Sequence, residues 1–145
     1  MKKLHSVISL IGFLFLISGC RPEIGGGGSV HHPPEYIETG KPTKLELELS
    51  VWGEGNQDVT KRYKEVACHF RIVGKDGFIW MPMMVSENMK GEGKAIYECY
   101  LPAFSEKDSN SVEYYFDMYF DGIYNKDPNV TVVPIRDTLQ EPNER

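Results

Sequence analysis

The 145-residue chain has few of the residues on which catalytic sites and metal centres depend. It contains 3 cysteines and 4 histidines, and it has no GxSxG, HExxH, P-loop or CxxC arrangement. A basic excess is lacking too. The formal net charge is −5, which argues against a nucleic-acid partner, because binding to phosphates requires a basic surface. These absences favour a protein that is not an enzyme and that uses no cofactor.

The chain also lacks a hydrophobic run long enough to span a membrane. Its most apolar stretch, residues 7–17, has 11 residues, whereas a membrane helix needs about 20. Two lysines precede this stretch, and small residues follow it, which is typical of a cleaved export signal. Residues 1–19 are therefore predicted to be a signal peptide. Its removal leaves 14 basic and 21 acidic residues, a net charge of −7.

The end of this signal, the sequence LISGC at residues 16–20, resembles the lipobox of bacterial lipoproteins. In that family the cysteine thiol receives a diacylglycerol, the chain is cut before the cysteine, and the new amino group is acylated. The resemblance implies that Cys20 is lipidated, and three acyl chains hold a membrane far more firmly than one does. Arg21 follows, not the aspartate that retains such lipoproteins in the inner membrane. The expected location is therefore the outer membrane of a Gram-negative bacterium.

Residues 20–42 show neither helical nor strand periodicity. They carry four glycines at 25–28 and then a Pro-Pro pair, a composition typical of a flexible segment followed by a stiffer one. We predict a tether that lets the rest of the chain stand off the membrane. His31 and His32 lie in it without a third ligand nearby, so they are expected to be solvated and not to bind a metal.

The remainder of the chain alternates apolar and polar residues, as half-buried strands do. The alternating runs lie at residues 44–52, 65–73, 78–85, 94–101, 112–121 and 130–135. Turn signals separate them, and only residues 59–66 could hold a helical turn. About six strands without a long helix predict one all-β domain, a single antiparallel β-sandwich over residues 43–135, with a polar tail at 136–145.

The strands also resemble immunoglobulin-like or fibronectin-III-like modules of bacterial surface proteins. The resemblance rests on an aromatic-Arg strand at 68–71, on Trp80, on a Tyr-to-Pro strand at 97–102 and on a Val-Glu-Tyr-Tyr strand that begins at Val112. It departs from the family at Asp121, where the family's aspartate is displaced. It implies an immunoglobulin-like sandwich, a fold that serves in adhesins, spacers, carbohydrate-binding units and assembly factors, and the fold alone does not choose among them.

Cys68 and Cys99 both fall on the inward faces of their predicted strands. Paired cysteines of an exported protein usually oxidise, and a bridge here would contribute about 3–4 kcal/mol. We predict a disulfide between them. The alternative is two buried thiols that pack as small hydrophobic groups, because the sequence does not give the distance between the two Cα atoms.

A four-residue loop at 74–77 would place alternate residues of a hairpin on an outward face, with the 112–121 strand beside it. The residues predicted on this face are His69, Arg71, Phe78, Trp80, Tyr115, Asp117 and Tyr119. Because Tyr, Trp and Arg dominate interfaces, we predict that this face binds a partner protein or a glycan. Two alternatives remain: Arg71 stacks on Trp80 on an ordinary exterior, or the tether covers the face.

Four oxygen-bearing residues crowd the loop after this strand: Asp121, Asn125, Asp127 and Asn129. They suit calcium, but the same residues build turns, and we favour a turn. The sequence thus predicts a lipid-anchored, non-enzymatic module for protein binding or envelope assembly. A carbohydrate-binding module is the alternative, and an enzyme or metal-binding lipoprotein is a third.

Overall fold

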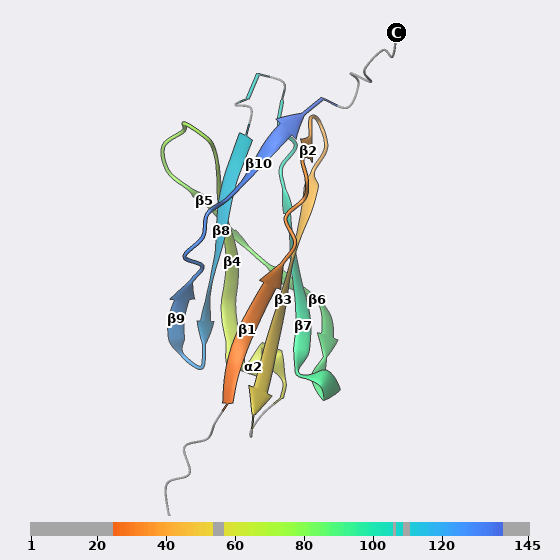
Figure 1. The fold of residues 1–145 in the computed structure, drawn as a ribbon, viewed down its shortest axis with the longest axis vertical. Helices are drawn as coiled ribbons and strands as arrows, with labels where there is room; N and C mark the ends of the chain where they lie inside the picture. The colour runs from red at the N-terminus through yellow and green to blue at the C-terminus, as the bar shows by residue number, and fades with distance from the viewer. Residues whose placement is uncertain (1–24, 54–56, 106, 109–110, 138–145) are drawn as a thin grey trace, which may run out of the picture.

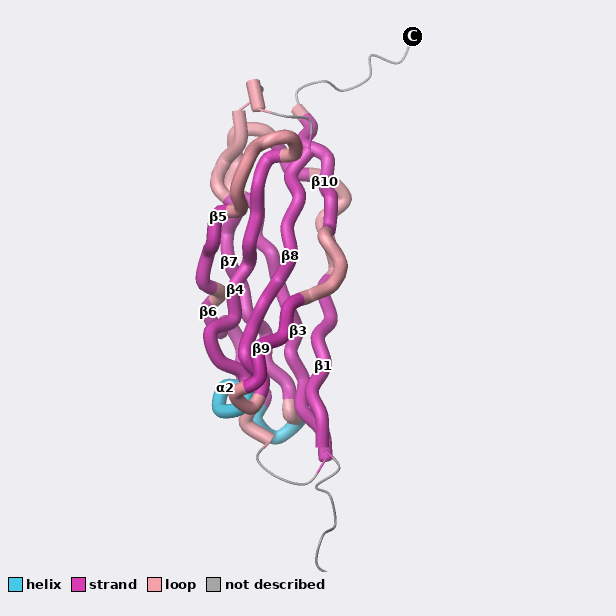
Figure 2. Tube along the Cα trace, turned by 90° about the vertical axis from the view of Figure 1, so that its left-hand side faces the viewer, coloured by secondary structure: helices cyan, strands magenta, loops and turns pink. Residues whose placement is uncertain are grey.

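The computed structural model describes residues 25–53, 57–105, 107–108 and 111–137. The predicted signal peptide and Cys20 lie outside these residues. The described part is an all-β domain in which two sheets face each other (Figures 1 and 2). Among the residues described, no helix is both long and apolar enough to cross a membrane.

The first sheet is antiparallel and has four strands. Their order is β1 (Gly25–His31), β3 (Thr43–Gly53), β7 (Lys94–Leu101) and β6 (Met84–Met89). β3 and β7 match the predicted strands closely, because both alternate regularly between buried and exposed residues.

The second sheet has six strands. Their order is β2 (Ile37–Glu38), β10 (Thr131–Arg136), β8 (Ser111–Phe120), β4 (Tyr63–Ile72) and β5 (Ile79–Pro82), with β9 (Ile123–Lys126) beside β8. β2 is parallel to β10, so this sheet is mixed and the expectation of a purely antiparallel sandwich was wrong. The arrows of β1 and β10 point the same way in Figure 1. β2 continues from β1 after the chain crosses between the sheets, so it joins β10 in parallel.

The core lies between the facing sides of the two sheets. β3 contributes Leu45, Leu47 and Leu49, and β8 contributes Tyr114 and Phe116, all of them buried. Side chains on a strand alternate between its two faces, and these are residues that the sequence placed inward. The inward faces of β3 and β8 were therefore predicted correctly.

Two short helical segments connect strands, α2 (Val59–Arg62) and the 3₁₀ turn η1 (Lys90–Glu92). Asp58 caps α2: its carboxylate accepts the Thr60 N–H at 3.2 Å and the Thr60 hydroxyl at 2.7 Å. The hydrogen bond from that hydroxyl is the largest cause that lowers the pKa of Asp58 to about 2. A helical turn within residues 59–66 is thus confirmed.

The segment predicted to be a flexible tether contains two strands, which corrects that prediction. The glycine run forms most of β1, which pairs with β3 along its whole length. Glycine is required there by close contacts, because a Cβ on Gly26 would lie 2.7 Å from the ring of Trp52 and one on Gly27 would lie 2.3 Å from the Tyr63 hydroxyl. Glycines carry no hydrophobic pattern, so no strand periodicity is detectable in this run. β1 also lies in the first sheet, so it does not cover the predicted binding face.

The predicted return strand at 78–85 is divided between the sheets. β5 pairs with β4 in the second sheet, and β6 pairs with β7 in the first. The chain crosses between them at Met83, whose N–H still donates to the carbonyl of Val66 at 2.9 Å and whose side chain is buried. Pro82 has no N–H to donate, which favours the end of β5 at that residue.

β9 was not predicted. It follows a two-residue turn at Asp121 and Gly122, which have φ angles of 49° and 80°. An Asp-Gly pair with two positive φ angles is the usual tight hairpin turn, because glycine adopts positive φ without strain. The segment expected to be a loop with a turn therefore begins as a β8–β9 hairpin.

Candidate functional site

The predicted binding face is the side of the second sheet that points away from the core, here called the outer face. His69 on β4 pairs with Trp80 on β5 and with Tyr115 on β8, so these residues form one row across three strands. Asp117 and Tyr119 follow along β8. The structure places all seven predicted residues on or beside this face.

The register of the β4–β5 hairpin differs from the predicted one by two residues. The sequence placed Arg71 opposite Trp80, whereas the structure pairs His69 with Trp80. Val73 has no partner on β5, because the chain already turns after Ile72, whose carbonyl accepts the N–H of Lys75 at 3.0 Å, and the loop is longer than four residues. Side chains alternate with a period of two, so an even shift keeps each residue on its predicted face.

A stacked His–Tyr pair lies at the centre of the outer face. The rings of His69 and Tyr115 are 4.7 Å apart and 3° from parallel. Nε2 of His69 is 2.8 Å from Oδ2 of Asp117, a contact that is ionic only when the imidazole is protonated and whose atoms are not aligned for a hydrogen bond. The hydroxyl of Tyr124 donates to the same Oδ2 at 2.9 Å, and this bond raises the pKa of Tyr124. Asp117 therefore joins β4, β8 and β9.

Arg71 and Lys126 are also held by contacts within the face. Arg71 pairs with Glu113, and its guanidinium carbon lies 4.3 Å from the ring centre of Phe78. The stack of Arg71 on Trp80 that the sequence suggested was therefore wrong, because the register shift moves Trp80 away. Nζ of Lys126 lies 4.1 Å from the ring centre of Tyr115. The charged groups at the centre of the face thus each have a partner.

Aromatic side chains around this centre are exposed to solvent. Trp80 is 59% exposed, Tyr124 is 51% exposed and Tyr119 is 37% exposed. The rings of Tyr119 and Tyr124 are 5.5 Å apart. Tyr124 and Lys126 were missed at the sequence level because β9 was missed, although the Asp-Gly turn that precedes it was a usable signal. The outer face therefore combines a paired polar centre with an exposed aromatic rim.

Cys68 and Cys99 face each other across the core, from β4 and β7 in opposite sheets. Both thiols are free and buried, and no disulfide joins these two described cysteines. A hydrogen bond with Cys99, together with burial, raises the pKa of the Cys68 thiol. The two thiols are thus in contact, and a bridge between them stays a prediction.

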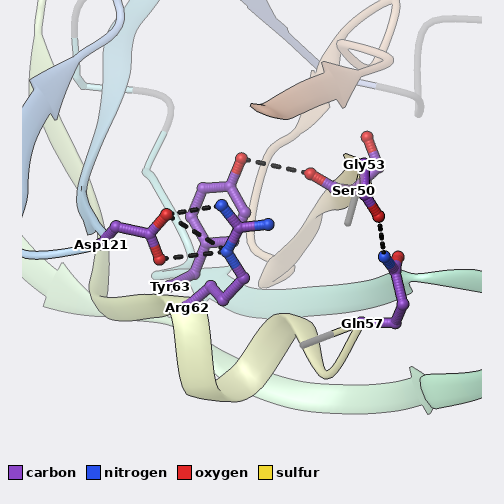
Figure 3. Close-up of polar contacts among 6 residues, drawn as sticks. All are labelled: Ser50, Gly53, Gln57, Arg62, Tyr63 and Asp121. Carbon is purple, nitrogen blue, oxygen red and sulfur yellow. Dashed lines mark hydrogen bonds and ion pairs between the residues drawn. The ribbon is translucent and has the colours of Figure 1, made fainter. Parts of the chain in front are cut away.

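The four candidate calcium ligands are engaged in local contacts. Asp121 forms a two-pronged pair with Arg62, with Oδ2 of the carboxylate 2.5 Å from Nη2, and Arg62 lowers the pKa of Asp121 (Figure 3). Asn125 donates its amide N–H to the carbonyl of Ile123 at 2.8 Å. The N–H of Asn129 donates to Oδ1 of Asp127 at 2.9 Å. In the described part of the chain, three or more His, Cys, Asp or Glu residues do not converge on a metal-binding geometry.

Comparison with known proteins identifies no family for this chain. No family model matches the sequence, and no curated protein matches it. A function for this chain must therefore come from its own geometry, and the outer face is the feature on which the largest number of sequence-predicted residues converge.

Proposed function

We propose that the chain is a lipid-anchored module of the bacterial cell envelope that holds a partner protein on its outer face and catalyses no reaction. The lipobox-like segment at 16–20 supports the anchor, with Cys20 as the lipidated residue in the outer membrane of a Gram-negative cell. Cys20 lies outside the described residues, so the anchor rests on the sequence alone.

The strand order supports an immunoglobulin-like identity for the fold. The first sheet, β1-β3-β7-β6, corresponds to the A-B-E-D sheet of immunoglobulin domains, and β10-β8-β4 corresponds to their G-F-C sheet. The cysteine pattern differs from that of antibody domains, whose bridge joins strands B and F. Here the two cysteines lie on β4 and β7, the equivalents of strands C and E.

The exposed aromatic rim of the outer face is the observation that carries the binding proposal. Trp and Tyr dominate the energetics of protein interfaces, because they bury large areas with few rotatable bonds. The paired centre matters as well. A partner that excludes water from this centre would not leave a single charge isolated, because Arg71 pairs with Glu113 and Asp117 accepts the hydroxyl proton of Tyr124. A partner can therefore gain binding energy from contacts with the aromatic rim without a large desolvation penalty at the charged centre.

The shape of the site favours a protein over a small metabolite. The rim aromatics project from three strands of one sheet, β5, β8 and β9, whereas small-molecule sites are usually concave. A sheet face matches another protein surface over a wide area.

Cross-linking in the native membrane tests the proposal. The lipidated protein is mildly cross-linked, purified and analysed by mass spectrometry, for the wild type and for Trp80→Ala and Tyr124→Ala. The matched control is Tyr100→Ala, which removes an aromatic ring that is 54% exposed but lies on β7 in the other sheet. We expect one partner to be recovered with the wild type and with Tyr100→Ala, and to be lost with both outer-face variants.

Two outcomes would count against this function. Equal recovery of the partner with Trp80→Ala and with the wild type would remove the outer face as the docking surface. Enrichment of no partner from native membranes would remove protein binding altogether. Circular dichroism of each variant shows whether a lost partner reflects lost folding.

Glycan binding on the same rim is the second candidate, because the exposed ring of Trp80 could stack on a sugar ring. Titration of glycans against tryptophan fluorescence tests it. Quenching in the wild type that disappears in Trp80→Phe would favour this function. Trp52 remains in that variant as an internal reference, since it lies on β3 in the first sheet.

A further inference from the structure

A second site lies between the two sheets, on the other side of β8 from the outer face. A cavity of about 380 Å³ opens between β1 and residues 125–129, which are the end of β9 and the start of the segment that joins it to β10. Figure 2 shows this segment passing beside β1. We propose that the cavity binds a neutral saccharide of one or two rings.

Local separation of the sheets creates the cavity. Gly27 and His31 on β1 face inward, because Gly27 lies against Tyr63 and His31 against Phe116. Side chains alternate along a strand, so Ser29 between them also faces inward, yet it is exposed. An inward residue of a sandwich is normally buried. Its exposure shows that the second sheet does not close over β1 at this level.

An interruption in the second sheet explains the gap. β9 ends at Lys126 and β10 begins at Thr131, so β8 has no partner strand on that side between them. A glycine on the opposite wall keeps the space open, because Gly27 faces it and has no side chain to fill it. The Tyr63 hydroxyl holds this wall, since it lies 3.3 Å from the carbonyl oxygens of both Gly28 and Ser50. Figure 3 shows the contact with Ser50.

The walls of the cavity combine aromatic carbon with neutral polar groups. The buried Phe116 and the half-buried Phe120 line it, together with three exposed polar residues, Ser29, Asn125 and Asn129. A sugar presents the complementary pattern, since the C–H groups of its ring pack on aromatic faces and its hydroxyls both donate and accept hydrogen bonds. The volume falls within the range of about 300–1,000 Å³ that is usual for small-molecule sites.

The charges at the rim favour a neutral ligand over an anion. Lys126 is among the residues that line the cavity, but its ammonium group lies over Tyr115 on the outer face. Asp127 is an acceptor at the rim, and one of its oxygens already accepts the N–H of Asn129. Hydroxyl groups can donate to the carboxylate, whereas a phosphate or carboxylate ligand would be repelled by it.

NMR titration of the full chain tests this site. The ¹⁵N-labelled protein is titrated to high millimolar concentration with glucose, galactose, N-acetylglucosamine, cellobiose and diacetylchitobiose. We expect at least one of them to shift the backbone amides of residues 27–29 and 125–129 in a saturable way. Ser29→Phe fills the opening and should abolish the shifts. Asn129→Ala removes one hydrogen-bonding group at the rim and should weaken binding about tenfold.

Val30→Ser is the matched control, because Val30 is the next residue on β1 and faces the other side of the sheet. This variant should bind as the wild type does. Absence of saturable shifts with all five sugars would overturn the proposal. Shifts confined to β5 and β8 around Trp80 would also overturn it, and would move sugar binding to the outer face.

This inference is independent of the protein-binding proposal. Ser29→Phe and Asn129→Ala leave the rim of the outer face unchanged, so both variants should still recover the cross-linked partner. Trp80→Ala should lose the partner and keep the sugar-dependent shifts. Failure of one proposal therefore leaves a result different from failure of the other.

Discussion

His31→Ala tests how the glycine-rich strand β1 is held to the domain. Nδ1 of His31 lies 2.6 Å from the carbonyl oxygen of Glu46, and Nε2 lies 2.7 Å from the Tyr114 hydroxyl. A carbonyl only accepts, so Nδ1–H donates to Glu46 and Nε2 accepts the proton of Tyr114. The imidazole ring also lies 4.9 Å from the ring of Phe116. One neutral side chain thus links β1 to its neighbour β3 and to β8 of the second sheet.

The expected cost follows from these contacts. The bond to the Glu46 carbonyl, which can be replaced by water, contributes about 0.5–1.5 kcal/mol, whereas a buried hydroxyl left without a partner costs about 1–3 kcal/mol. Tyr114 is fully buried, and His31→Ala would leave its hydroxyl without the hydrogen bond to His31. We therefore expect His31→Ala to lower the free energy of unfolding by about 2–4 kcal/mol.

Urea denaturation followed by circular dichroism measures this free energy. His32→Ala is the control, because His32 is the exposed neighbour and its loss should change stability by less than about 0.5 kcal/mol. Hydrogen exchange adds a local readout, since the amides of β1 should exchange faster in His31→Ala than those of β7. Equal stability of the two variants, or unchanged exchange in β1, would refute the reasoning.

Three further predictions follow from buried contacts. Burial lowers the pKa of His31 below its usual 6.5, so the unfolded chain binds more protons in mild acid. Stability should fall as the pH is lowered from about 7 through the histidine range, and this dependence should be smaller in His31→Ala, as urea titrations at several pH values would show. Gly27→Ala should destabilise the domain by about 1–3 kcal/mol in thermal melts, because its Cβ would lie 2.3 Å from a hydroxyl oxygen, whereas Gly91→Ala meets nothing within 4 Å and should be neutral. Cys68 and Cys99, in contact across the core, should yield no titratable thiol in the exported chain, and reduction should lower stability by about 3 kcal/mol; two titratable thiols in the denatured chain would contradict the bridge.

The strands that alternate regularly were predictable from the sequence. Leu45, Leu47 and Leu49 mark the inward face of β3 so clearly that the strand and its orientation follow from the period alone. The outer face was predictable for the same reason, even though the hairpin register was wrong. An even shift changes the neighbours of Trp80 without moving it to the other face.

The elements that were missed depend on contacts between distant residues. β1 has no side-chain pattern at its glycines, and its strand conformation depends on pairing with β3 and on the ring of Trp52 that lies over Gly26. Val73 continues the pairing with β8 through Ser111 but has no partner on β5, so the β4–β5 loop is longer than its local turn signal suggests. The cavity depends on how far the two sheets separate. The pairing of β1, the length of this loop and the separation of the sheets cannot be inferred from the local sequence pattern.

The position of β1 limits how far the domain could stand from a membrane to which Cys20 is anchored. The sequence suggested a tether of about twenty residues, but β1 begins at Gly25, only five residues after Cys20. Five residues span at most about 18 Å when fully extended. If Cys20 carries the proposed lipid, the end of the domain at which β1 begins must lie near the membrane surface. Figure 1 shows α2 and the β8–β9 turn at this same end. A partner on the outer face, which includes β9, would therefore be held close to the membrane. A membrane-bound protein would fit this position. The cross-linking experiment accordingly uses native membranes and not a soluble extract.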